Sequence, residues 1–287
     1  MRLSSVLLVA IAALLAPIGL EAQQWRTIEA ARQLSDSQPL KVSVRYAAGK
    51  LDLSPSEDAA LLYQMRIRYD EQATDAVHAY DARGHRLELG LSKSEVGWRT
   101  LRNMKGDKGG SMSLELSPAV PLDLDVGLGG AAARMELGGL KLKSLSLECG
   151  MAGSEVSFSD PNRIQMERMT IDLGMGGLKV QDLGNANVGE IAIHGAMGGV
   201  SLDFGDDLQR DVKISADFAL GALEIAVPPG VGVMYQGEMK AGKFEPSIGF
   251  TRMDNAWYSM NWKDASRHIT IVGNSTLADV KIQLSGR

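Results

Sequence analysis

Residues 169–180 read MTIDLGMGGLKV, residues 191–204 read IAIHGAMGGVSLDF, and residues 212–227 read VKISADFALGALEIAV. Each stretch contains two runs of alternating apolar and polar residues, joined by a pair of very small residues. Successive side chains of a strand point to opposite faces, so each run predicts a β-strand with one apolar face. A shift of one residue would expose that whole face, which fixes the register of each strand.

The small pairs recur at a nearly constant spacing between Leu122 and Val227. They are Gly129-Gly130, Ala152-Gly153, Gly176-Gly177, Gly198-Gly199 and Gly221-Ala222, and their first members are 23, 24, 22 and 23 residues apart. The period predicts an all-β, single-domain β-solenoid, a β-helix-like coil of about 23 residues per turn. Glycine is expected at each corner because Cβ atoms would crowd there. The alternative is an antiparallel β-meander, in which each small pair is a hairpin loop.

One apolar residue comes directly before each small pair. These residues are Leu128, Met151, Met175, Met197 and Leu220. Alternation assigns them to the inner face, so stacked coils are expected to bury them as one internal column. The single cysteine, Cys149, shares that face, which predicts a buried thiol. One cysteine also excludes an intrachain disulfide.

Three residues before each member of that column is a polar residue of the opposite face. These five residues are Asp125, Glu148, Asp172, His194 and Asp217. In stacked coils they would form an outer column with neighbours about 5 Å apart, where like charges repel. One interpretation is that the side chains fan outward and that water and salt screen the repulsion. The more specific interpretation is that the column binds a divalent cation or a basic partner.

The N-terminus has the composition of an export signal. Arg2 precedes an apolar run from Val6 to Leu20, which is shorter than the roughly 20 residues of a membrane span. We therefore expect residues 1–22 to be a signal peptide, cleaved between Ala22 and Gln23. The alternative is a retained membrane anchor. Cleavage predicts an exported protein that is periplasmic, cell-surface or secreted, with no transmembrane helix in the mature chain.

Residues 23–39 are expected to form a short helical lead-in. Trp25, Ile28, Ala31 and Leu34 are spaced as on one face of a helix, and Pro39 closes the segment. The repeat domain would then span residues 40–287.

Two later segments interrupt the alternation. Between Lys93 and Gly110, five basic residues predict a solvated loop, or a contact with anionic lipid or cell-wall polymer. Towards the C-terminus, Trp257, Tyr258 and Trp262 predict an aromatic cap over the open end of the stack, because uncovered strand edges aggregate.

Composition and motifs argue against several functions. The chain of 287 residues has a net charge of −5, which argues against nucleic acid as a partner. Its four histidines have no close metal-ligand spacing, and the glycine-rich stretch Gly195–Gly199 lacks the Ser or Lys of nucleophile and phosphate-binding loops. We therefore predict no enzymatic activity, no catalytic residues and no cofactor.

Several segments resemble the bacterial toast-rack family of exported β-repeat domains. They are Val42–Leu53, Leu62-Tyr63, Arg68–Asp70, Pro121–Leu124, Glu136–Leu140, Phe158–Asn162, Leu202–Phe204 and Tyr258–Trp262. The chain is more distantly similar to the C-terminal domains of LiaF-type envelope-stress proteins and to the head domains of adhesins. The resemblance implies an all-β coil outside the cytoplasm, without known catalytic residues. The chain lacks the cluster of membrane spans that precedes the repeats in LiaF-type proteins.

We therefore predict an exported, non-enzymatic β-solenoid with a binding, adhesion or structural role at the bacterial cell envelope. The expected partner is a protein or a cell-envelope polymer. Two alternatives come from other classes: a glycan-processing enzyme of the β-helix type, whose carboxylates would lie along outward strand faces, and an envelope-stress sensor domain.

Overall fold

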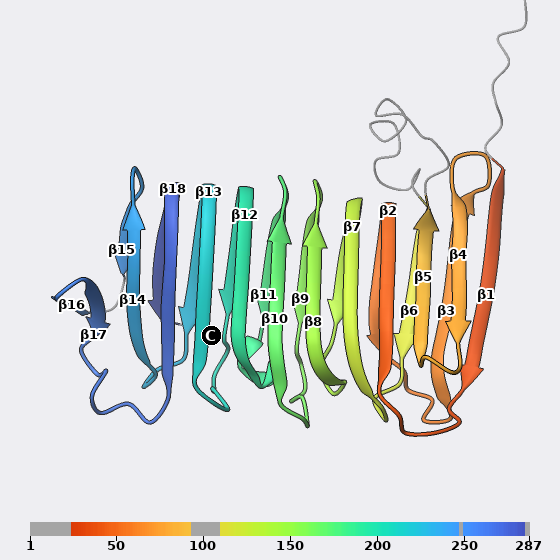
Figure 1. Cartoon of the computed structure of the whole chain (residues 1–287), viewed down its shortest axis with the longest axis horizontal. Helices are drawn as coiled ribbons and strands as arrows, with labels where there is room; N and C mark the ends of the chain where they lie inside the picture. The colour runs from red at the N-terminus through yellow and green to blue at the C-terminus, as the bar shows by residue number, and fades with distance from the viewer. Residues whose placement is uncertain (1–23, 93–109, 247–248, 285–287) are drawn as a thin grey trace, which may run out of the picture.

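The computed structural model of the protein describes residues 24–92, 110–246 and 249–284 (Figure 1). The predicted signal peptide, its cleavage site at Ala22 and Gln23, and most of the basic segment lie outside these ranges. The strands are β1 (Trp25–Gln33), β2 (Leu40–Pro55), β3 (Leu61–Asp70), β4 (Asp75–Asp81), β5 (Arg86–Ser92), β6 (Ser111–Leu116), β7 (Pro121–Glu136), β8 (Lys141–Cys149), β9 (Gly153–Ser157), β10 (Met166–Leu173), β11 (Gly177–Gln181), β12 (Val188–Asp203), β13 (Val212–Val227), β14 (Gly232–Met239), β15 (Phe244–Pro246), β16 (Phe250–Met253), β17 (Ala256–Ser259) and β18 (His268–Leu284). Among the described residues the helical element is one 3-10 turn, η2 (Leu183–Ala186). The all-β class is confirmed, and within the described ranges no helix is long and apolar enough to cross a membrane.

Equivalent strands of successive repeats lie side by side and pair in parallel (Figure 1). β7 pairs with β8 and β9, which pair with β10 and β11, and β12 and β13 follow. The alignment is residue for residue between long strands: Met197 pairs with Leu220, and Leu220 pairs with Leu277. Parallel pairing of this kind excludes the antiparallel meander for the repeats.

The order of strands in space departs from the order in the chain at both ends. The last strand, β18, lies between β13 and the pair β14 and β15. At the other end, β2 pairs in parallel with β7 on one side and with β5 and β6 on the other. The terminal strands β1, β3 and β4 then add in antiparallel orientation. The β16–β17 hairpin lies at the end of the stack opposite β1 (Figure 1), where Trp257 lies 5.6 Å from Phe244 between ring centroids.

The prediction of an N-terminal helix is wrong, because residues 25–33 form strand β1. Ile28 pairs with Ile67 in the antiparallel β1–β3 ladder, and the Arg68 guanidinium lies 4.1 Å from the Trp25 ring centroid. Without β1, the backbone of β3 on that side would lack partners. Pairing with this free edge outweighs the weak helical spacing of a nine-residue segment.

Glycine permits the close approach of neighbouring repeats at the corners, as predicted. A Cβ atom on Gly176 would overlap the carbonyl oxygen of Ala152, and one on Gly198 would overlap that of Gly176. Gly198 and Gly221 also have φ angles of 142° and 140°, which L-residues with side chains rarely adopt. The first member of these pairs is therefore fixed as glycine by the stacking itself.

The inner faces of the strands enclose one apolar core, formed by residues such as Ile171, Ile193 and Ile214, each 0% exposed. Cys149 is buried, as predicted, and burial raises the pKa of its thiol. The predicted internal column is wrong for four of its five members. Leu128 is 4% exposed, but Met151, Met175, Met197 and Leu220 are 41%, 56%, 48% and 39% exposed. The chain bends at each corner, so alternation does not continue through it and the residue at the bend points outward.

Candidate binding surface

A long groove of about 830 Å³ crosses the outer face of the stack just beyond the corners. Its lining comes from six strands, β2, β7, β9, β11, β12 and β13, which contribute equivalent positions. On five of the six strands the floor consists of the smallest side chains, on β2 Lys50 takes that position, and a charged row forms one wall. The floor residues are Ala132, Gly153, Gly177, Gly199 and Ala222. The groove therefore follows the stacking direction and repeats its chemistry from strand to strand.

Close packing does not require glycine at the floor positions. A Cβ atom on Gly153 would meet nothing within 4 Å, and on Gly177 or Gly199 the nearest atom would lie at 3.9 Å or 3.8 Å. Ala222 occupies the position that pairs with Gly199, so the backbone accepts a side chain there. What these glycines provide is open space on the outer face.

The charged row alternates in sign along the groove. Pairing aligns Asp52 with Arg134, Arg134 with Glu155, and Glu155 with Lys179. Ser201 and Glu224 continue the row inside the groove, and Lys281 extends it beyond. The Arg134 Nε atom lies 3.8 Å from the Glu155 Oε2 atom, and both side chains are exposed, so this pair adds little stability. The row offers hydrogen-bond donors and acceptors of both charges to a ligand.

The structure aligns four of the five residues of the predicted outer column; the exception is Asp125. Asp172 pairs with Glu148 and with His194, and His194 pairs with Asp217. A register shift near Asp123 instead places Asp125 opposite Ser146. All four aligned side chains are exposed. Within the described ranges no three His, Cys, Asp or Glu side chains are grouped closely enough to hold a metal ion. The cation or partner column stays a prediction.

A basic residue that the sequence did not link to this column lies at its end. Arg45 extends over Gly127, the residue that pairs with Glu148, and forms an ion pair with Asp125. The hydrogen bond to Asp125, followed by the charges of Asp125 and Glu148, raises the pKa of Arg45 against the opposing effect of burial. At the other end Asn274 donates a hydrogen bond of 3.4 Å to Asp217. The repulsion is therefore partly relieved within the protein.

Glu136 is a half-buried carboxylate that closes the turn between β7 and β8. It accepts hydrogen bonds from the Gly138 and Ser159 amides, at 2.7 and 3.0 Å, and from the Ser157 hydroxyl at 2.6 Å. Burial opposes ionisation, but these hydrogen bonds outweigh it and lower the pKa of Glu136. The ionised carboxylate therefore stabilises the folded chain.

The pH dependence of stability follows from that direction. The contribution of Glu136 is complete above its unfolded pKa and is lost as pH falls through the lowered folded value. We expect Glu136→Gln to lower the unfolding free energy by about 1–2 kcal/mol at pH 7, and by less at pH 3. Urea titrations at both pH values measure the difference, with the exposed Glu155→Gln as the control. A loss that is the same at pH 7 and pH 3 would contradict the assignment.

Sequence reasoning missed both the groove and its charged row, although signals for each were present. Both members of every small pair were assigned to the corner, yet only the first is needed there. Glu155, Lys179, Ser201 and Glu224 each follow the first member of a pair by three residues. Reading that position down the repeats shows a charged or hydroxyl residue in four of the five, with Glu155 followed by Lys179, whereas Arg134 and Asp52 join the row only through the pairing of β7 with β9 and β2.

Comparisons with known proteins place the chain in a family. No curated protein matches it in sequence. Among solved structures, a proposed cell adhesion protein from Clostridium sporogenes is 16% identical, with a TM-score of 0.45 over 90% of this chain and 100% of that one. A proposed adhesin from Bacteroides fragilis is 11% identical, with a TM-score of 0.44 over 91% and 98%. A proposed lipid-binding protein from Parabacteroides distasonis is 11% identical, with a TM-score of 0.35 over 90% and 96%.

The family model described as the N-terminal domain of toast_rack, DUF2154, matches residues 21–181, which is more than half of the sequence. The matched region includes most of the segments that carry the resemblance noted in the sequence. The chain therefore belongs to the toast-rack family.

Proposed function

We propose that the protein is an exported, non-enzymatic β-solenoid that binds an extended polymer of the bacterial cell envelope along its groove. The observation that carries this proposal is the repetition of the groove lining. Five floor positions and the charged row recur on successive strands. An adhesin-like or structural role at the envelope follows from such binding.

The solenoid assignment rests on the pairing between repeats. Both arms of a repeat pair in parallel with the same two neighbours: β12 pairs with β13 from Glu190 to Asp203, across the corner, without a change of register. β13 pairs with β18 in the same way. Such stacking, with glycines at the close approaches, is what a coil of constant period requires.

An extended ligand fits the groove better than a compact one. Neighbouring strands are about 4.8 Å apart, so a chain lying along the groove meets the same small floor and a charged or hydroxyl side chain at each step. Alternating acidic and basic side chains suit a polar polymer that carries both donors and acceptors, such as a cell-wall glycan. A compact ligand would use only one or two of these equivalent positions.

A binding role is favoured over glycan cleavage by the arrangement of the groove carboxylates. Glycosidases place two carboxylates on either side of one bond. Asp52 and Glu155 are separated by a whole strand, and Arg134 lies between them in the row. Groove carboxylates alternating with cations suit recognition of a polar chain. Release of reducing ends from cell-wall polysaccharide by the purified protein would overturn the non-enzymatic assignment.

Filling the groove tests the proposal. We expect Gly153→Phe combined with Gly199→Phe to reduce cosedimentation with purified cell-wall glycan at least about fivefold, because both new rings would occupy the floor. Neither glycine has a close neighbour on that side, so the variant should fold.

The matched control is Ser215→Phe, which adds an exposed ring on β13, in the arm that precedes the corner. It should bind as the unaltered protein does, and circular dichroism should give all three proteins the same melting temperature within a few degrees. Equal binding by the filled and unfilled proteins would contradict the groove as the binding surface.

A further inference from the structure

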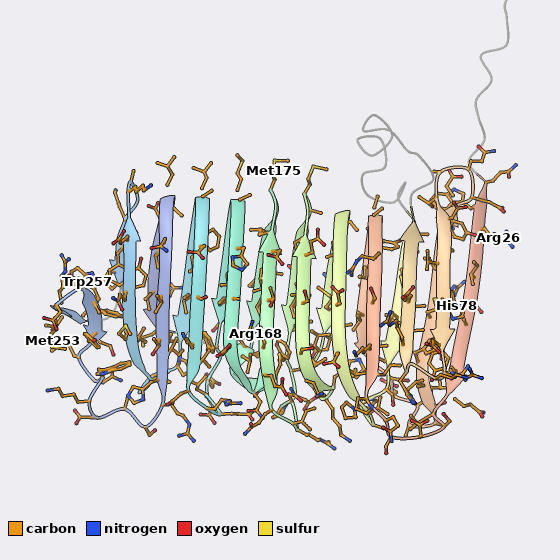
Figure 2. All side chains as sticks on the ribbon, in the orientation of Figure 1. Arg26, His78, Arg168, Met175, Met253 and Trp257 are labelled. Carbon is orange, nitrogen blue, oxygen red and sulfur yellow. The ribbon has the colours of Figure 1, made fainter. Side chains whose placement is uncertain are left out.

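A row of exposed apolar side chains runs along one long edge of the stack. Met175 lies at this edge in Figure 2, and its equivalents in neighbouring repeats continue the row. The members, here called the apolar ridge, are Met151, Met175, Met197, Leu220 and Leu277, with exposed fractions of 41%, 56%, 48%, 39% and 52%. The residue at this position is a large apolar one in five neighbouring repeats, although the core does not need it to be.

The surroundings of four of the five ridge members are uncharged; beside the fifth, Leu277, Asp279 follows two residues later. Residues 149–154, 173–178, 195–200 and 218–223 contain no Asp, Glu, Lys, Arg or His. Solvated corners of β-structures ordinarily carry polar or charged side chains, and a contiguous exposed apolar patch marks an interaction site. Methionine, which occupies three of the five positions, adapts its shape to irregular apolar surfaces.

We propose that the apolar ridge is a membrane-docking edge, whose side chains enter the interfacial region of a lipid bilayer. In-register stacking places the five side chains in a straight line, with neighbours about 4.8 Å apart. A straight edge can bring all of its members to a flat surface at once. Apolar side chains that reach the boundary between headgroups and acyl chains bind a membrane in proportion to the apolar area they bury.

The dimensions of the apolar ridge favour a bilayer over a second copy of the chain. The ridge is one residue wide, and five half-exposed side chains offer at most a few hundred Å². A stable protein interface needs about 800 Å² from each partner. Binding to a bilayer does not require such an area, because the bilayer supplies an apolar environment around every inserted side chain.

The start of the described chain lies at the same edge. β1 begins there, and its second residue, Arg26, is labelled near that edge in Figure 2. The 23 residues before Gln24 include the apolar run Val6–Leu20, whose composition suits a membrane. If this run is retained as an anchor, it would attach the chain to the membrane at the side that carries the apolar ridge.

The charges near the apolar ridge indicate which lipids are compatible. Three residues before four of the ridge members are Glu148, Asp172, His194 and Asp217, and two residues after Leu277 is Asp279, all exposed. Carboxylates at this distance from the bilayer would be repelled by anionic headgroups. We therefore expect docking on zwitterionic phospholipid, without strengthening by anionic lipid.

Flotation of the full-length chain with phosphatidylcholine vesicles tests the ridge. The triple variant Met151→Gln, Met175→Gln and Met197→Gln should bind about tenfold more weakly than the unaltered chain. The matched control is Met253→Gln with Met260→Gln, two exposed methionines in or directly after the β16–β17 hairpin (43% and 81% exposed), which should change nothing. All variants share the apolar N-terminal run, so a difference between them belongs to the substituted residues.

A fluorescent probe locates the contact independently of that run. An environment-sensitive dye on Met175→Cys should shift to the blue when vesicles are added, and the same dye on Met260→Cys should not; Cys149 is 1% exposed and stays unlabelled. Equal flotation of the triple variant, or no shift at position 175, would overturn the proposal. A dimer in solution that the triple variant abolishes would assign the ridge to a second copy instead. Severalfold stronger binding to vesicles containing phosphatidylglycerol would overturn the choice of lipid.

Discussion

Gly198→Ala is expected to lower the unfolding free energy by about 2–4 kcal/mol, whereas Gly199→Ala should change it by less than about 1 kcal/mol. The two glycines are adjacent and belong to one small pair. Gly198 has a φ of 142°, and a Cβ atom there would overlap the carbonyl oxygen of Gly176. At Gly199 the nearest atom to a Cβ would be 3.8 Å away, and Ala222 already occupies the equivalent position on β13.

Urea denaturation of both variants, followed by circular dichroism, measures this difference. Because the two substitutions add the same methyl group one residue apart, chain entropy and helix or strand propensity are closely matched between them. Tolerance of Gly198→Ala, or an equal loss in both variants, would show that the corners do not require a bare backbone. The result bears on the close approach of paired strands at the corners and is independent of what the groove binds.

The sequence predicted the strands well because two periodicities agree in it. Alternation marks each strand, and the recurrence of small pairs about 23 residues apart fixes how the strands align. From these, the inward position of Ile171, Ile193 and Ile214 follows without a structure. The family resemblance pointed to the same class of fold.

The corners were mispredicted because alternation is a property of a straight strand. Between the buried residues Leu173 and Leu178 lie four residues, so the inward positions on the two arms differ in parity. A strict period of two cannot pass through such a bend. Met175 was therefore assigned to the core, although the bend directs it outward. The same error concealed the apolar ridge.

The ends of the stack were harder to predict because they depend on pairing between distant residues. β1 has spacing compatible with a helix, and only the unpaired edge of β3 makes it a strand. β18 lies beside β13 although β14 to β17 intervene in the chain. Arg45 meets Asp125 across the β2–β7 pairing, 80 residues apart in sequence. Local patterns contain no information about such partners.

Ile171→Asp is expected to unfold the protein or to lower the unfolding free energy by more than about 4 kcal/mol, while Met175→Asp should cost less than about 1 kcal/mol. Ile171 is 0% exposed and pairs with Leu147 and Ile193, so a carboxylate there would be buried among apolar groups without a cation. Met175, four residues later, is 56% exposed, and its replacement remains in water.

Thermal melts of the two aspartate variants measure this contrast, and Ile171→Val provides a core variant that should still fold, at a loss of about 0.5–1.5 kcal/mol. Met175→Asp should leave the melting temperature nearly unchanged and yet weaken vesicle binding, because an ionised side chain is costly to bring into the bilayer interface. Destabilisation by Met175→Asp as large as that by Ile171→Asp would mean that the side chain is buried, and the apolar ridge would then not exist. A stable Met175→Asp variant that binds vesicles as before would leave the ridge exposed but remove its role in docking. The two measurements therefore separate the geometry of the edge from its function.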